Sequence, residues 1–183
     1  MTMDGLRDGI HRQAQRIESA ADYSSQAHFN TGAFYRVVHY VFGAAAAGLG
    51  ALTTVPLVFI PSLGVWIAEV SGLGAVVLMS VVVAVNPGET AFQQYQAGNQ
   101  YLTLRYAALE FLDLDVNRSG SSLEVLDAKA QDLQKRLDQL NETNGNLWKP
   151  RWAFHKADRD IRAGRTAFGR ASSPHNPWDP KHR

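Results

Sequence analysis

The residues that could do chemistry in this chain gather in a cationic segment near its C-terminal end. From Lys149 to Arg170 the sequence is rich in Lys and Arg and has few carboxylates, so the surface of this segment attracts anions. Two interpretations are open: a basic helix held near acidic lipid headgroups, or a site for a nucleotide or nucleic acid. The candidate anion-binding residues are Arg151, Lys156, Arg159, Arg162 and Arg165.

No pattern typical of an enzyme accompanies these cations. The sequence lacks GxSxG, a Walker lysine loop, HExxH and a glycine-rich dinucleotide fingerprint. It has no cysteine, which excludes thiolate nucleophiles and Cys-ligated metals. Its 6 His residues are scattered without metal-ligand spacing. We therefore expect no enzyme, no catalytic residue, no metal site and no cofactor.

The middle of the chain is apolar and almost uncharged. Of the 18 Lys and Arg residues, none lies between Arg36 and Arg105. Residues 38–58 and 70–88 are each close to the roughly 20 apolar residues that cross a bilayer. Residues 41–60 and 70–85 show no polar helical face, which disfavours core helices of a soluble bundle. The sequence predicts an all-α membrane protein with a two-helix transmembrane hairpin over residues 37–88.

The distribution of cations also predicts the orientation of the hairpin. Cytoplasmic flanks of membrane helices are enriched in Lys and Arg, and here both flanks carry them while the connector Phe59–Glu69 carries none. Pro61, Ser62, Gly64 and Trp66 favour a turn with an interfacial aromatic in that connector. We expect a multi-pass protein of the cell membrane with both termini inside.

Two features of the hairpin bear on assembly. Gly43, Ala47 and Ala51 recur every four residues and allow close helix approach, either to the second helix of the same chain or to another copy. Glu69 is the one formal charge between Val37 and Gly88. A second crossing that begins at Val70 leaves Glu69 at the outer rim, where an oligomer would form a ring of carboxylates that attracts cations. A crossing that begins at Val65 would bury it at high cost.

Helical segments flank the hairpin on the cytoplasmic side. Residues 1–36 contain an amphipathic helix with Leu6, Ile10, Ala14, Ile17 and Ala21 on one face. Residues 89–168 form a cytoplasmic bundle of about three further helices, and the tail 169–183 is expected to be disordered. The further helices are expected at about 87–112, where Asn86 and Pro87 cap and open the helix and Glu89 lies in its first turn, at 123–140, with Ser121 or Ser122 as N-cap, and at 150–168.

The helix at 123–140 has leucines at alternating steps of three and four residues. This heptad pattern is shorter than a confident coiled coil. It either packs against the other cytoplasmic helices of its own chain or forms a self-association seam.

The residues that follow the second crossing resemble a known family. Two crossings, an Asn-Pro pair that closes the second, and a helix with a Gly, an aromatic and a Leu-x-Leu-Arg ending are similar to the SLATT family of two-transmembrane effectors of prokaryotic conflict systems. The residues that carry the resemblance are Asn86, Pro87, Glu89, Ala97, Gly98, Tyr101, Leu102, Leu104 and Arg105.

The resemblance implies a membrane effector of antiviral defence. Such an effector perforates or depolarises the prokaryotic inner membrane when an upstream sensor, often a cyclic-nucleotide-producing enzyme, reports infection. Its expected partners are the lipid bilayer, further copies of the chain and a sensor protein or cyclic nucleotide, with no DNA. The alternative is a membrane-tethered binding module that recruits a partner or nucleotide without forming a pore. A holin-like phage protein is disfavoured by the large cytoplasmic part.

Overall fold

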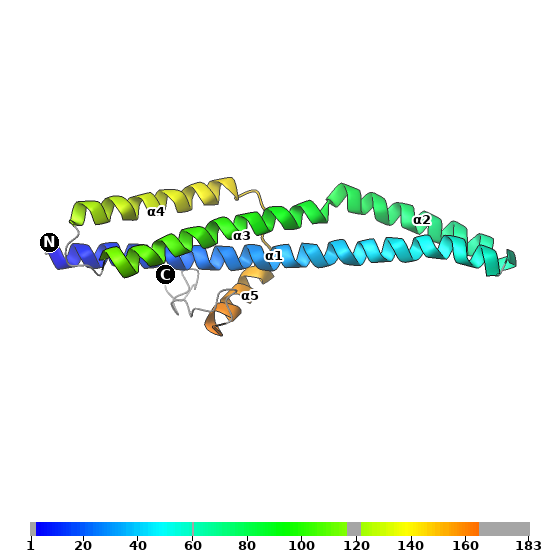
Figure 1. Cartoon of the computed structure of the whole chain (residues 1–183), viewed down its shortest axis with the longest axis horizontal. Helices are drawn as coiled ribbons and strands as arrows, with labels where there is room; N and C mark the ends of the chain where they lie inside the picture. Colours follow the sequence, from blue (N-terminus) through cyan, green and yellow to red (C-terminus); the bar gives the residue numbers. More distant parts are fainter. Residues whose placement is uncertain (1–2, 60, 117–121, 165–183) are drawn as a thin grey trace. The chain divides into compact units, whose positions relative to one another are not determined.

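The described part of the chain is built of helices. The structure is a computed structural model that describes residues 3–59, 61–116 and 122–164, and within these residues it contains no strand. The helices in chain order (Figure 1) are α1 (Met3–Phe59), α2 (Pro61–Val85), α3 (Pro87–Glu110), the π-helical turn η1 (Phe111–Val116), α4 (Leu123–Thr143) and α5 (Arg151–Arg162).

The chain divides into two compact units. One comprises Met1–Thr31 and Gln94–Arg183, and the other comprises Gly32–Gln93. We call the first the bundle unit, because parts of α1 and α3 lie in it together with α4 and α5. We call the second the apolar unit, because it contains α2 and the most apolar stretch of the sequence.

The core of the bundle unit is formed by the stripes that the sequence predicts. On α1, Ile10, Ala14, Ile17 and Ala21 are buried as expected, whereas Leu6 is exposed. They belong to one cluster with buried residues of α3, η1 and α4. The α3 and η1 members of that cluster are Tyr101, Leu104, Ala108, Phe111 and Leu112.

Helix α4 begins and packs as its sequence pattern indicates. The hydroxyl of Ser122 accepts a hydrogen bond from the backbone N–H of Val125 and caps the helix, one of the two predicted caps. The seam of α4 lies in the hydrophobic cluster of its own chain, so the interpretation as internal packing is confirmed. The buried members of the seam are Leu126, Ala130, Leu133 and Leu137.

Helix α5 is shorter than predicted. Pro150 precedes it with extended backbone, and Ala153, Ala157 and Ile161 form its buried face. The helix ends at Arg162 rather than near residue 168, because Gly164 adopts φ of 66°, the left-handed conformation that terminates helices. The predicted disordered tail lies outside the described residues.

In the apolar unit, α1 and α2 pack against each other through small residues. A Cβ placed on Gly74 would lie 3.5 Å from Leu49 of α1, and one on Gly72 would lie 3.6 Å from Thr53. Within the described residues, one helical stretch, Val65–Leu114, contains a segment long and apolar enough to cross a membrane, and 6% of that segment is buried. The side chains of residues 54–64 lie outside the described set.

The predicted connector between the two crossings is wrong. We expected a turn over Phe59–Glu69, but α1 continues to Phe59 and α2 already begins at Pro61. Proline fits the first position of a helix, where its missing N–H has no partner to lose, so Pro61 opens a helix instead of making a loop. Residue 60, between the two helices, is outside the described residues.

One predicted boundary is confirmed and one differs. Helix α2 ends at Val85, because Asn86 leaves the helical conformation at the predicted Asn86–Pro87 junction. The expected polar break after Leu112 contains the π-helical turn η1, which continues to Val116, and residues 117–121 are outside the described residues.

Candidate functional site

The first residues that carry the predicted resemblance form the junction between α2 and α3. Asn86 has φ of 42°, and its N–H still donates to the carbonyl of Val82 at 2.9 Å. Its side-chain oxygen accepts from the N–H of Glu89 at 3.4 Å, and Pro87 is the buried first residue of α3. Asn86 therefore ends one helix and caps the next, as predicted, with Glu89 in the first turn of α3.

Gly98 is required by the close approach of α1 to α3. A Cβ at this position would lie 2.8 Å from the ring of Phe29, closer than van der Waals contact allows. The ring of Phe29 is also held beside Tyr95, with centroids 6.2 Å apart. A glycine at position 98 allows the two helices to meet at an aromatic ring.

Arg105 is the centre of a buried ion network. Its Nε lies 3.0 Å from Oε1 of Glu18, and its Nη1 lies 3.4 Å from Oδ1 of Asp22. The exposed fractions of these three side chains are 2%, 5% and 0%. Burial raises the pKa of Glu18 above its ordinary value, although the hydrogen bond and charge of Arg105 oppose that rise. Removing one member would leave buried charge without compensation.

His28 is a buried, neutral member of the same helix interface. Gln94 donates its amide to the carbonyl of Trp148 at 3.0 Å, so its Oε1 accepts from Nδ1 of His28 at 2.6 Å. Nε2 of His28 is then an unprotonated nitrogen, and it is buried without a hydrogen-bond partner in the described structure. Burial lowers the pKa of His28 to about 4.

Tyr101 connects this interface to α4 and to Lys149. Its ring stacks on His28 with a centroid distance of 5.4 Å, and its hydroxyl donates to Oδ1 of Asn141 at 2.8 Å. The ammonium of Lys149 lies 5.9 Å from the centroid of the same ring, within the range of a cation–π interaction. Burial lowers the pKa of Lys149 and raises that of Tyr101 to about 12.

A pocket of about 540 Å³ opens beside these residues in the bundle unit. Its volume lies within the roughly 300–1,000 Å³ of small-molecule sites. It is bounded by α1, the C-terminal end of α4, α5, and Lys149 in the segment between α4 and α5. The lining residues are Tyr23, Ser24, Asn141, Lys149, Phe154, His155 and Asp158.

The carboxylate of the pocket is already engaged. Asp158 accepts a hydrogen bond from the hydroxyl of Tyr23 at 2.9 Å and lies 3.0 Å from Nε of Arg162. Burial raises the pKa of Tyr23, and the hydrogen bond to Asp158 adds to the rise. Asp158 therefore ties α5 to α1.

The predicted anion-binding residues do not line this pocket. Arg151, Lys156, Arg159 and Arg162 are exposed on α5, and Arg162 pairs with Asp158. Arg165 lies outside the described residues. The cation that lines the pocket is Lys149, which precedes α5 and was not among the predicted site residues.

The predicted packing and pore-mouth residues lie on the outside of the apolar unit. Gly43, Ala47 and Ala51 are exposed, and a Cβ on Gly43 would meet nothing within 4 Å. Glu69 is also exposed, and it lies within α2 rather than in a connector.

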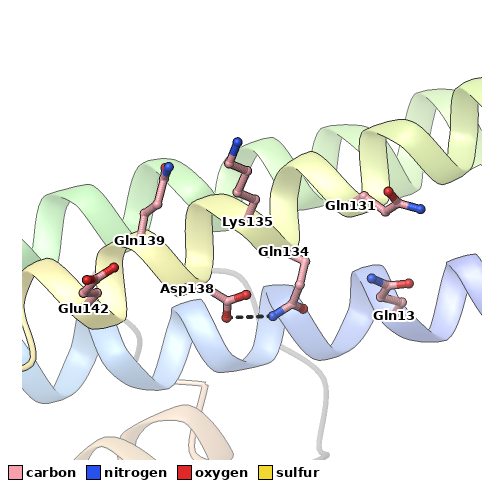
Figure 2. A pocket seen from close by; sticks show the side chains of 7 residues that line it. All are labelled: Gln13, Gln131, Gln134, Lys135, Asp138, Gln139 and Glu142. Carbon is pink, nitrogen blue, oxygen red and sulfur yellow. Dashed lines mark hydrogen bonds between the residues drawn. The ribbon is translucent and has the colours of Figure 1, made fainter.

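A second pocket of the bundle unit, of about 330 Å³, has a different character (Figure 2). It lies along α1 and α4 and is lined by glutamines and charged side chains, among which Gln134 donates to Asp138 at 3.0 Å. Lys135 and Gln139 point away from α1 in Figure 2. Because these side chains are solvated and no aromatic ring lines the pocket, the Lys149 pocket is the better candidate site.

Sequence reasoning missed the polar half of the interface. Glu18, Asp22 and Ser25 are buried next to the apolar stripe of α1, although acidic residues in a helix are ordinarily assigned to its surface. Two signals were available. The three residues follow one another at steps of four and then three positions, which places them on one helical face, and Arg105 is the single cation within the apolar pattern of α3. Neither signal names the partner.

No group of three His, Asp or Glu side chains in the described ranges could hold a metal ion. Comparison of the sequence and the structure with family models, curated proteins and solved structures finds no match.

Proposed function

We propose that this protein is an effector of prokaryotic antiviral defence that oligomerises in the inner membrane and opens a pore or disrupts the bilayer. Helix α2 and the C-terminal half of α1 cross the membrane as a hairpin, and both termini face the cytoplasm. The bundle unit receives the signal from an upstream sensor, which is a protein or a cyclic nucleotide. The proposal assigns no reaction to the chain.

The observation that carries the proposal is the exposed apolar surface of α2. Val76, Val77 and Val83 are 64%, 57% and 74% exposed, and such a surface is stable in hydrocarbon rather than in water. The absence of Lys and Arg between Arg36 and Arg105 supports cytoplasmic ends and two crossings.

Glu69 supports assembly of several chains. It lies eight residues after the start of α2 at Pro61, or about 12 Å along the helix. A carboxylate that far into a crossing is costly in lipid and is found facing a bundle interior or a water-filled cavity. Two packed helices enclose no lumen, so the water-filled cavity must come from several copies in closed symmetry.

The exposed small residues of α1 suit such an assembly. Gly43, Ala47 and Ala51 are exposed in the apolar unit, and small residues at this spacing promote close helix contact in membranes, here with a second copy. The resemblance to SLATT effectors supports the same function, and several of the residues that carry it lie at the α1–α3 interface of the bundle unit.

The test is membrane potential in cells. We would express the chain with candidate trigger systems, such as a cyclic-nucleotide-producing enzyme, in cells loaded with a potential-sensitive dye. Depolarisation that requires both components supports the proposal. An unchanged potential under every trigger, with the chain present in the membrane, contradicts it.

Glu69→Gln distinguishes a pore from general toxicity. The variant should reduce cation flux relative to anion flux, because it removes the carboxylate from the proposed lumen. Glu124→Gln changes an exposed carboxylate of α4 and is the matched control, for which the flux should be unchanged. A selectivity that is equal in both variants argues against a lumen lined by Glu69.

The second candidate function is a membrane-tethered binding module. It is favoured by the cationic surface of α5 and by the pocket beside it. Liposome leakage separates the two functions, because a tether binds its partner without releasing an encapsulated dye. A C-terminal reporter that appears in the periplasm would contradict both.

A further inference from the structure

The pocket beside Lys149 holds a cation without a matching anion. Among the residues that the structure describes, no carboxylate lies within ion-pair distance of Lys149, and its recorded contact is with the ring of Tyr101. The pocket carboxylate, Asp158, is occupied by Tyr23 and Arg162. A half-buried ammonium of this kind gains more from an anionic ligand than an exposed one does, because less water is present to screen the attraction between the two charges.

The rest of the wall supplies neutral donors and flat apolar surface. Ser24 and Asn141 line the pocket, and the hydroxyl of Ser24 and the amide nitrogen of Asn141 have no hydrogen-bond partner within the described structure. The aromatic residues Tyr23, Phe154 and His155 line it as well. Donors beside a cation suit an oxyanion, and aromatic rings suit a planar group that stacks on them.

We propose that this pocket binds a small molecule in which an anionic group is joined to a planar ring. The anion pairs with Lys149 and accepts from Ser24 or Asn141, and the ring packs against Tyr23 and Phe154. Nucleoside monophosphates and aromatic carboxylates share this chemistry. The inference deepens the proposed function, since it names a site for the signal, and it rests on that function only for its effect at the membrane.

The contacts of Lys149 suggest how occupancy reaches the remainder of the helix interface. Lys149 lies over Tyr101, Tyr101 stacks on His28, and His28 donates to Gln94. Gln94 in turn donates to the carbonyl of Trp148, the residue before Lys149. A ligand that draws the ammonium away from Tyr101 therefore acts on residues that hold α1 and α3 together.

Affinity labelling on the full chain in detergent tests the site. The probe is pyridoxal 5′-phosphate, whose aldehyde condenses with a neutral lysine amine and releases water. Borohydride then adds hydride to the imine and fixes the label as a secondary amine. Peptide mapping should find Lys149 labelled at least fivefold more than Lys129, Lys135 or Lys156, and labelling that is spread evenly over these lysines would overturn the proposal.

Protection separates a binding site from a merely reactive amine. Adenosine monophosphate and 4-hydroxybenzoate are the two competitor arms, with inorganic phosphate as the third. Protection of Lys149 by either of the first two at concentrations where phosphate gives none supports the proposal and identifies the source as nucleotide or aromatic carboxylate. Protection by neither, or equal protection by phosphate, contradicts it.

A direct binding measurement uses two matched variants. Lys149→Met keeps the length of the side chain and removes its charge, and Lys156→Met does the same on the exposed surface of α5. In saturation-transfer NMR with the protecting competitor, we expect at least tenfold weaker binding to Lys149→Met and unchanged binding to Lys156→Met. Equal affinities of two variants that retain the wild-type unfolding midpoint would refute the site. Because these experiments measure binding to the solubilised chain, they succeed or fail independently of pore formation.

Discussion

The helices inside each of the two units are held together by a different kind of interaction. In the bundle unit, helices meet through buried directional contacts: Arg105 with Glu18 and Asp22, and His28 with Gln94. In the apolar unit, the recorded contacts between α1 and α2 involve small residues, and large apolar side chains face outward. Directional contacts specify one arrangement and tolerate little change. The stability that comes from non-directional apolar contacts depends on whether water or lipid surrounds the helices.

The largest difference between the units should follow from removal of Arg105. Arg105→Met leaves Glu18 and Asp22 buried near each other without a counter-charge, which costs about 3–5 kcal/mol. We expect the unfolding midpoint of the detergent-solubilised chain to fall sharply. The exposed pair of Arg136 and Asp132, 2.8 Å apart, provides the control, since Arg136→Met should cost below about 1 kcal/mol. Similar losses in the two variants would mean that the buried network contributes no special stability.

A charge on the outside of α2 should reveal the solvent of the apolar unit. Val76 and Val125 are similarly exposed, at 64% and 51%, in α2 and α4. Val76→Lys should oppose insertion by about 2.5–3.5 kcal/mol if lipid surrounds α2, whereas Val125→Lys should change stability by about 0.5 kcal/mol or less. The measurement is the fraction of chain retained in carbonate-washed membranes. Equal retention of both variants would mean that the exposed face of α2 at Val76 does not meet lipid.

Acidification should weaken the bundle unit through His28. The unfolded residue titrates near 6.5 and the folded one near 4, so below about pH 6.5 the unfolded state holds more protons. The stability that depends on neutral His28 is complete above that pH and is lost as the pH falls toward 4. Between pH 7 and pH 5 the loss is about 2 kcal/mol.

The raised pKa of Glu18 acts in the opposite direction, so the comparison is between wild type and His28→Gln. The variant should lose less stability than wild type over this interval, and His11→Gln, on the same helix, should behave as wild type. Thermal unfolding at both pH values measures the effect. A slope that is unchanged in His28→Gln would rule out this residue as its source.

The smallest effect concerns glycines in the two units. Gly98→Ala brings a Cβ against the ring of Phe29 and should cost about 1–2 kcal/mol after the gain in helix propensity. Gly43→Ala meets no neighbour within 4 Å and should leave the unfolding midpoint unchanged or slightly raised. Adding Phe29→Leu to Gly98→Ala should restore part of the loss, and an absence of rescue would mean that the contact is not the cause.

Local patterns in the sequence predicted much of the helical architecture. The apolar stripe on α1, the seam of α4, the cap at Ser122 and the Asn86–Pro87 junction depend on neighbours within a few residues. The start of α2 was not predicted, because proline is common both in turns and at the first position of a helix, and the sequence around Pro61 does not separate these roles.

The candidate site was largely invisible in the sequence. Glu18 and Asp22 resemble surface residues until Arg105 is known to meet them. Because burial of an unpaired charge is costly, a buried position is not predicted for them while the partner is unknown. The Lys149 pocket requires side chains from α1, α4 and α5. The count of cations in α5 drew attention instead to solvated residues, because a sequence shows charge and not the access of water to it.

The ion network also sets an order of events during synthesis. Glu18 and Arg105 are separated by 87 positions, and at about 5–20 residues per second a ribosome needs roughly 4–17 s to travel between them. During that interval the acidic residues of α1 have no arginine from α3, and the whole of residues 32–93 is made. The buried face of the N-terminal residues therefore has no partner from α3 while the apolar segment emerges, and the bundle unit can close only after that segment has been translated.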